Sequence, residues 1–287
     1  MLELSPDWAS PGYIASAWHV LLLVAGGISL FCVLAHHQRW RGLPAPGVRE
    51  WRVGWIDIGI LFCMLFMWAL VAGSITARLL PLGEDPTPAL RAWRSAIDGT
   101  TLQLGMALIF LILWLAQPFE RRLSFNSEPM HTGAAFRKAL LYILALMPLR
   151  YLLEMLWGST LKLLEGMGLP LPMNAQDVVT DLSVTEPLGA FILLVIMAGL
   201  LAPVVEEMVF RAGLYRFLKG RVGKEAAIFS TAALFAMLHY NLLAFPTLML
   251  LGVALCLAYE ATGNIKVPMF MHALFNLNSV FLIVLQA

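Results

Sequence analysis

The most regular feature of the chain is a series of long apolar runs separated by short polar segments. Several of these runs approach the roughly 20 apolar residues that cross a hydrocarbon core of about 30 Å. Helical assignment gives eight of them, at roughly 13–35, 55–77, 99–117, 139–161, 188–211, 226–244, 246–262 and 268–285. The pattern predicts an all-α fold, a polytopic transmembrane helical bundle of about eight spans.

The composition narrows the class of protein further. Hydrophobic residues make up 60% of the 287 positions and charged residues only 13%, with a mean hydropathy of +0.79. A soluble domain carries about 25% charged residues, so the natural surroundings of this chain are a lipid bilayer. The net charge of +1 gives no reason to expect a nucleic acid as partner. Cys32, Cys63 and Cys256 fall inside apolar runs without a spacing pattern and are typical of small core residues.

The basic residues indicate how the runs are oriented. The segments after the first, third and fifth runs, together with Lys266, hold 14 of the 19 Lys and Arg residues. Because cytoplasmic loops of membrane proteins are enriched in Lys and Arg, we place these segments in the cytoplasm and both termini on the opposite face. We expect a multi-pass integral membrane protein, and the nearly loop-free layout is typical of a prokaryotic inner membrane.

Polar residues inside the runs divide the chain at about residue 185. The N-terminal part, 1–185, has about four spans that are mostly apolar, whereas 186–287 carries nearly all of the intramembrane polar side chains in about four more. The exception in the first part is Arg150 with Glu154, four residues apart and just after Pro148. Two interpretations stay open: a self-neutralising pair that steadies a kinked helix, or a pair that lines a substrate path.

The stretch from Pro203 to Arg211 contains two adjacent carboxylates in a run that begins at Leu188 with no other charge before them. An ionisable group at the bilayer centre costs roughly 2.5 to 3.5 kcal/mol, so it usually faces the bundle interior or a wet cavity. Glu207 and Arg211 are four residues apart with the acid N-terminal, the favourable order for a helical ion pair. Glu206 points about 100° away from Glu207. We therefore predict that Glu207 is held by Arg211 and that Glu206 is available.

Two later runs carry imidazole groups at helical spacing. Phe235 and His239 are four residues apart, and so are His272 and Asn276. A single His in an apolar helix is more often a core residue whose hydrogen bonds are satisfied than a functional residue. Here two such His residues lie in the same part of the chain as an unpaired Glu, which favours a functional role. We predict that Glu206, His239, His272 and Asn276 face one cavity, since each would otherwise carry its own desolvation cost.

The depths of these residues pose a geometric problem. His239 lies about 20 Å along a helix that starts near Ala226, whereas Glu206 is only about 7 to 8 Å from Arg211. The two residues meet if the Glu206 helix continues into the cytoplasm past Arg211, or if the 226–244 helix is tilted or starts later.

The order Glu-Glu-x-x-x-Arg, Phe-x-x-x-His and His-x-x-x-Asn, each in its own run, resembles the CAAX protease and bacteriocin-processing (CPBP, also called Abi) family. This family of intramembrane proteases includes the Rce1-type prenyl-protein endopeptidases. The resemblance covers about residues 186–285. It implies an intramembrane endopeptidase that hydrolyses a peptide bond of a membrane-associated protein or peptide, with 186–287 as the catalytic core. Members often have Gly directly after the motif Arg, whereas here Ala212 stands between Arg211 and Gly213.

The resemblance also implies roles for individual residues. Glu206 would be the general base that activates a water, and His239 would help to hold and polarise that water. His272 and Asn276 would donate hydrogen bonds to the oxyanion formed when water attacks the peptide carbonyl.

Three further residues would support the site. Glu207 and Arg211 would fix the helix and the electrostatics of the site, and Phe235 would pack beneath His239. No Ser or Cys is placed to act as a nucleophile, so an acyl-enzyme is not expected.

The cofactor and the function class each leave alternatives open. Glu206, His239 and His272 could bind Zn²⁺, yet the His-Glu-x-x-His spacing of zincins is absent, and we favour a metal-free site. A non-catalytic immunity factor or chaperone of the same family would be expected to have lost a motif residue. An ion-coupled transporter would be expected to have broken helices in two corresponding halves, whereas the polar residues here occupy one.

Overall fold

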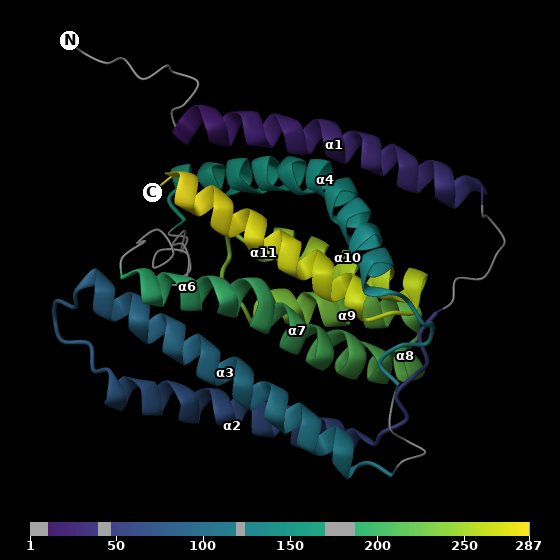
Figure 1. Ribbon diagram of the computed structural model, residues 1–287, viewed down its shortest axis with the longest axis horizontal. Coiled ribbons are helices and arrows are strands. Elements are labelled where there is room, and N and C mark those ends of the chain that lie inside the picture. The colour runs from purple at the N-terminus through teal and green to yellow at the C-terminus, as the bar shows by residue number, and fades with distance from the viewer. Residues whose placement is uncertain (1–10, 40–46, 119–123, 170–186, 287) are drawn as a thin grey trace.

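The computed structural model describes residues 11–39, 47–118, 124–169 and 187–286, and these residues form helices and no β-strand. The elements, with the labels of Figure 1, are α1 (Pro11–Arg39), α2 (Trp55–Leu79), α3 (Pro88–Ala116), α4 (Thr132–Gly166), α6 (Leu188–Ile196), η3 (Met197–Leu201), α7 (Ala202–Glu207), η4 (Met208–Tyr215), α8 (Arg216–Val222), α9 (Lys224–Met237), α10 (Phe245–Thr262) and α11 (Lys266–Gln286).

The predicted fold class is confirmed. Seven helical segments of the described chain are long and apolar enough to cross a membrane: α1 to α4, the continuous segment Leu188–Val222, α10 and α11. The remaining predicted span, 226–244, is wrong in its extent. It corresponds to α9, which has 14 residues and ends at Met237.

Helix α9 ends at Met237 because Asn241 and Pro246 favour the start of the next helix, α10. The Asn241 side chain accepts a hydrogen bond from the Ala244 backbone N–H at 2.8 Å, and Pro246 occupies the first turn of α10, where its missing N–H is not needed. Tyr240 takes a φ of 49°, which is rare for a bulky residue. His239 therefore lies in a turn and not, as predicted, on a continuing helix face.

The segment Leu188–Val222 is one continuous helix with two π-helical stretches, η3 and η4, on either side of α7. Pro203, near the start of α7, has no N–H to donate to the preceding turn, and π-helical stretches often occur at such interruptions and at functional sites. The helix continues to Val222, past the predicted end at Arg211. At 1.5 Å per residue Glu206 lies about 24 Å from its end, and α9 is about 20 Å long, so the depth problem is resolved by the longer helix.

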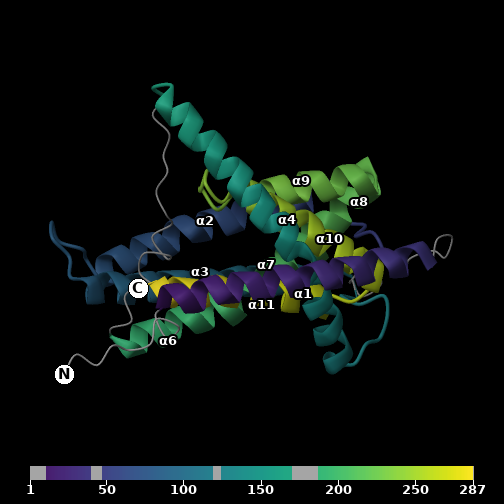
Figure 2. The same cartoon turned by 90° about the horizontal axis from the view of Figure 1, so that it is seen from above.

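The continuous segment α6 to α8 lies in the middle of the bundle (Figure 1). Helices α2 and α3 lie on one side of it and α1, α4 and α11 on the other, with α9 and α10 beside its C-terminal half. The start of α1 and the end of α11 lie at the same end of the bundle in both views (Figures 1 and 2). Helices from the two predicted parts of the chain, 1–185 and 186–287, pack against one another. The division at residue 185 stays a prediction.

Helix α4 is bent near its middle, where Pro148 interrupts it (Figure 1). Pro148 leaves the Leu144 carbonyl without its helical donor, and α1 packs against this point through Gly26. A Cβ atom at Gly26 would lie 2.6 Å from the Leu144 carbonyl oxygen and 2.7 Å from Pro148 Cδ. The glycine is therefore what lets the two helices approach.

Candidate active site

The centre of the site is the buried ion pair that the sequence predicts. Arg211 Nη1 donates to Glu207 Oε1 at 2.8 Å, and both side chains are fully buried. Arg211 Nη2 also donates to the Gly252 carbonyl of α10 at 3.4 Å. A buried charge without its partner is strongly destabilising, so these contacts fix the level at which α7 and η4 meet α10.

Phe235 joins this ion pair to the two imidazole groups. The guanidinium carbon of Arg211 lies 4.5 Å from the centre of the Phe235 ring, within the range of a cation–π contact. The same ring lies edge-on to His239, at 4.7 Å between centroids, and to His272, at 5.6 Å. Phe235 itself is completely buried. It is the packing element that holds α9, α11 and η4 in register.

Glu206 lies beside this cluster with its side chain 15% exposed. Its Oε1 accepts a hydrogen bond from Gln103 Nε2 of α3 at 2.9 Å, and its Oε2 faces His272 Nε2 at 3.8 Å. The second distance is too long for a direct hydrogen bond but allows one water to bind both atoms. Glu206 thus has one oxygen anchored and one directed toward an imidazole.

His272 is buried between the two carboxylates. Its Nδ1 lies 3.0 Å from Glu207 Oε1 and its Nε2 faces Glu206. A carboxylate only accepts hydrogen bonds, so Nδ1 carries a proton and donates it to Glu207. Nε2 then presents a lone pair in the neutral ring and an N–H in the charged ring.

His239 is oriented by the end of its own helix. Its Nδ1 lies 2.7 Å from the Phe235 carbonyl oxygen, which can only accept, so Nδ1 is the donor. In the neutral ring Nε2 therefore carries the lone pair. The contact keeps His239 against Phe235 although α9 has ended.

Asn276 lies one turn beyond His272 on α11, and its Nδ2 donates to the Ala198 carbonyl in η3 at 2.7 Å. Close packing makes this contact possible, because a Cβ atom at Gly199 would lie 2.6 Å from Leu277 Cδ2. The structure brings Glu206, Glu207 and His272 into contact and links His239 to them through Phe235. That Glu206, His239, His272 and Asn276 face one cavity stays a prediction.

Within the described ranges, no group of three or more His, Cys, Asp and Glu side chains is arranged to hold a metal ion. In particular, Glu206, His239 and His272 do not form such a set as they are placed. Glu207 Oε1, the acceptor nearest to them, already accepts from both Arg211 and His272.

Sequence reasoning missed Gln103. Its side chain is buried, and among the described residues its Oε1 has no hydrogen-bond partner. A carboxamide in an apolar run is itself a signal, since it must find partners inside the bundle. Nothing in the pattern, however, indicated that its partner would be Glu206, 103 residues later in the chain.

The Arg150–Glu154 pair is formed, with Arg150 Nε 2.8 Å from Glu154 Oε1. The guanidinium carbon lies 4.9 Å from the centre of the Phe275 ring, next to Asn276 on α11. Arg150 Nη1 is buried and has no hydrogen-bond partner among the described residues. The pair thus contacts the helix that carries His272, and both interpretations from the sequence stay open.

Comparison with known proteins gives one match, over residues 188–278, to the family model described as type II CAAX prenyl endopeptidase Rce1-like. The matched residues contain Glu206, Glu207, Arg211 and both site imidazoles, and the match confirms the resemblance recognised from the motifs. It points to a protease. No curated protein and no solved structure matches the chain.

Proposed function

We propose, from the premise that residues 188–278 are an Rce1-like domain, that the chain is an intramembrane endopeptidase. It hydrolyses a peptide bond of a protein or peptide held at the membrane, with a water activated by Glu206. One observation carries this proposal: a chain of polar contacts runs from Gln103 through Glu206, His272 and Glu207 to Arg211 in the middle of an apolar bundle. An ionisable group inside the membrane lowers the stability of the protein, so its presence there indicates a functional role.

In this mechanism Glu206 Oε2 takes a proton from the water as the water oxygen attacks the carbonyl carbon. His239 Nε2 accepts a hydrogen bond from the second O–H of the water, which stays intact, and so orients the water. When the C–N bond breaks, protonated Glu206 gives its proton to the leaving amine. The hydrogen bond from Gln103 holds Glu206 Oε1, so that Glu206 Oε2 is directed toward the reacting water.

The oxyanion would be stabilised by donors from α11. Asn276 Nδ2 has two N–H groups, of which Ala198 takes one, so the second can donate to the oxyanion. His272 can donate from Nε2 when its ring is charged, and Glu207 stabilises that charge from the Nδ1 side. Loss of one such donor typically raises the barrier by about 2.7 to 4 kcal/mol.

We propose that this chemistry proceeds without a metal ion, since the described side chains are not arranged as a ligand set. Proteolysis by the purified chain should then be unchanged, within twofold, after treatment with EDTA or 1,10-phenanthroline. Abolition by chelator with recovery on addition of Zn²⁺ would refute the metal-free mechanism and leave the protease assignment intact.

The activity can be tested with the purified chain in lipid vesicles and a pair of internally quenched peptides. Both end in Cys-aliphatic-aliphatic-X, and only one carries a farnesyl group on the Cys, the chemistry that the name of the matched family describes. The native chain should cleave at least one peptide, and Glu206→Gln, which keeps the size of the side chain, should reduce kcat by at least 1,000-fold. Equal cleavage by both chains would overturn the role of Glu206.

A further inference from the structure

A second polar region lies far from the carboxylates, at the end of the bundle opposite the start of α1 and the end of α11. It is an open cavity of about 1510 Å³ between the extended segment 48–54, the segment 124–127 and helix α8. In Figure 1 this is the end at which α8 is labelled. The activity proposed above does not account for it, and ten of its 14 described lining residues lie before residue 188, where the family match begins.

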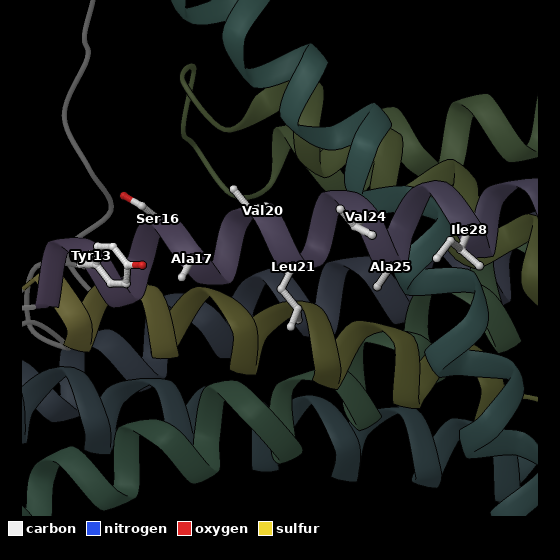
Figure 3. Close-up of a pocket in the computed structure, with 8 residues that line it drawn as sticks. All are labelled: Tyr13, Ser16, Ala17, Val20, Leu21, Val24, Ala25 and Ile28. Atoms are coloured by element: carbon white, nitrogen blue, oxygen red, sulfur yellow. The ribbon is translucent and has the colours of Figure 1, made fainter. Parts of the chain in front are cut away.

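A second hollow, of about 740 Å³, lies on the described part of α1 and is apolar. Its eight lining residues all lie on α1 and follow one another at helical spacing from Tyr13 to Ile28 (Figure 3). It is an apolar stripe on one helix that is long enough to cross the membrane, and nothing in the structure says what covers it.

The polar cavity is strongly positive. Among the described residues, its lining contains one carboxylate, Glu50, and five cationic side chains: Arg49, Arg52, Arg216, Lys219 and Arg221. Of these cations, only Lys219 has a carboxylate partner among the described residues, Glu260, at 2.6 Å. Like charges gathered in one cavity repel one another, so an anion bound there would be stabilised.

Three of the cations have a structural role. Arg216 donates to the Arg49 carbonyl, Lys219 to the Val48 carbonyl at 2.9 Å and Arg221 to the Val53 carbonyl. These bonds fasten the extended segment to α8, and the Trp51 backbone N–H adds a bond to the Arg216 carbonyl at 3.0 Å. The accepting carbonyls are neutral, so these bonds do not compensate the charges of Arg216 and Arg221, whereas the charge of Lys219 is compensated by Glu260.

Arg49 and Arg52 are not explained in this way. Both are exposed, and neither forms an ion pair or a side-chain hydrogen bond within the described part of the chain. They lie on the segment that the other three cations hold in place. The bonds to α8 therefore fix the position of two arginine side chains whose donors remain available to a ligand.

The cavity lies where lipid headgroups are expected. It adjoins Trp55, which begins one candidate membrane span and is 65% exposed, and Val222, which ends another. Exposed Trp residues are enriched at the membrane–water interface. The guanidinium carbon of Arg221 stacks on Phe217 at 3.7 Å and lies 5.5 Å from the Trp55 ring. Aromatic side chains beside cationic ones at this level match the acyl chains and the phosphate of a lipid.

We propose that this cavity binds the phosphate group of an anionic membrane lipid, with Arg49 and Arg52 as its donors. Arginine is suited to this ligand because its planar guanidinium binds phosphate oxygens in pairs. The positive-inside pattern places the cavity on the cytoplasmic side, the leaflet whose anionic lipids attract basic segments. The site is separate from the candidate active site, and binding there does not depend on proteolysis.

Native mass spectrometry of the detergent-purified chain tests the proposal, with phosphatidylglycerol, diacylglycerol of the same acyl chains and inorganic phosphate as probes. Phosphatidylglycerol should bind, and the double variant Arg49→Gln/Arg52→Gln should weaken that binding about 25-fold, roughly fivefold for each charge removed. The matched control is Arg137→Gln/Lys138→Gln, which removes two exposed charges from the first turns of α4, outside the cavity lining. This control should change binding by less than twofold.

Each contrary outcome is decisive. Equal affinity for phosphatidylglycerol and diacylglycerol would show that the phosphate is not recognised. Equal losses in the two double variants would show general attraction and no site. Displacement of the lipid by millimolar inorganic phosphate would make soluble phosphate the ligand and overturn the lipid assignment. Thermal unfolding of both variants is measured in parallel, and both are expected to unfold within 2 °C of the native chain.

Discussion

At the scale of single residues, the adjacent carboxylates of Glu206 and Glu207 lie in different surroundings. Glu207 is fully buried and compensated by Arg211, whereas Glu206 is partly exposed and contacts a carboxamide and an imidazole. The 100° between neighbouring helix positions accounts for this separation, and the i,i+4 spacing made the Glu207–Arg211 pair predictable from sequence. The contact with Gln103 was not predictable, because it depends on how α3 packs against α7.

Arg211 and Glu206 should respond differently to substitution. Arg211→Met leaves Glu207 buried without its partner and should lower the free energy of unfolding by about 3 to 5 kcal/mol. Glu206→Gln leaves the buried Glu207–Arg211 pair intact and should change the free energy of unfolding by less than about 1 kcal/mol. Denaturant or thermal unfolding in detergent measures both. Equal stability of the two variants would mean that Arg211 is not the partner on which Glu207 depends.

Gln103 should act as a positioning residue for Glu206. Gln103→Leu removes a hydrogen bond to a charged group, worth about 1.5 to 3 kcal/mol, and should lower kcat by about 10- to 150-fold with little change in KM. Gln103→Glu places a second carboxylate beside Glu206, and their repulsion should move the acid limb of the pH–rate profile to higher pH. Gln117→Leu, which changes the residue directly after the last residue of α3, is the control for loss of a carboxamide. An unshifted profile in Gln103→Glu would contradict the assigned contact.

At the scale of elements, apolar periodicity predicted where helices lie but not where they change. The 226–244 run is mostly apolar and carries no Asp, Glu, Lys or Arg, yet Asn241 and Pro246 begin a new helix and leave His239 in a turn. The π-helical stretches around α7 were likewise not foreseen, although Pro203 marks an interruption. The early end of α9 and the π-helical stretches both lie beside candidate site residues. Functional sites are where a structure most often departs from what the local sequence predicts.

Close approach of α1 and α4 depends on one glycine of an adjacent pair. Gly26→Val places side-chain atoms against the Leu144 carbonyl and Pro148 and should lower stability by about 1 to 3 kcal/mol. Gly27→Val meets no atom within 4 Å and has the same helix propensity, so it is the control and should be nearly neutral. Thermal unfolding of the two purified variants compares them directly. Equal losses would show that α1 is not packed at this point.

At the scale of the whole molecule, the candidate site is assembled from both parts of the chain. The residues that match the Rce1-like family model, 188–278, supply Glu206, His239, His272 and Asn276, and α3, outside the matched residues, supplies Gln103. The sequence predicted the membrane bundle from its apolar runs, and it predicted the Glu207–Arg211 pair because buried charges must be compensated. It could not predict contacts between distant helices, which depend on how the whole bundle packs.

The most direct test of the proteolytic function compares protein termini in membranes of cells that carry the native chain or Glu206→Gln. Because the substrate is found by its cleavage, no peptide has to be chosen in advance. A small set of new termini should be present with the native chain and absent with Glu206→Gln, and the uncut precursors should accumulate. Identical termini in the two membranes, with both proteins folded and equally abundant, would contradict the proposal that Glu206 activates water for peptide hydrolysis.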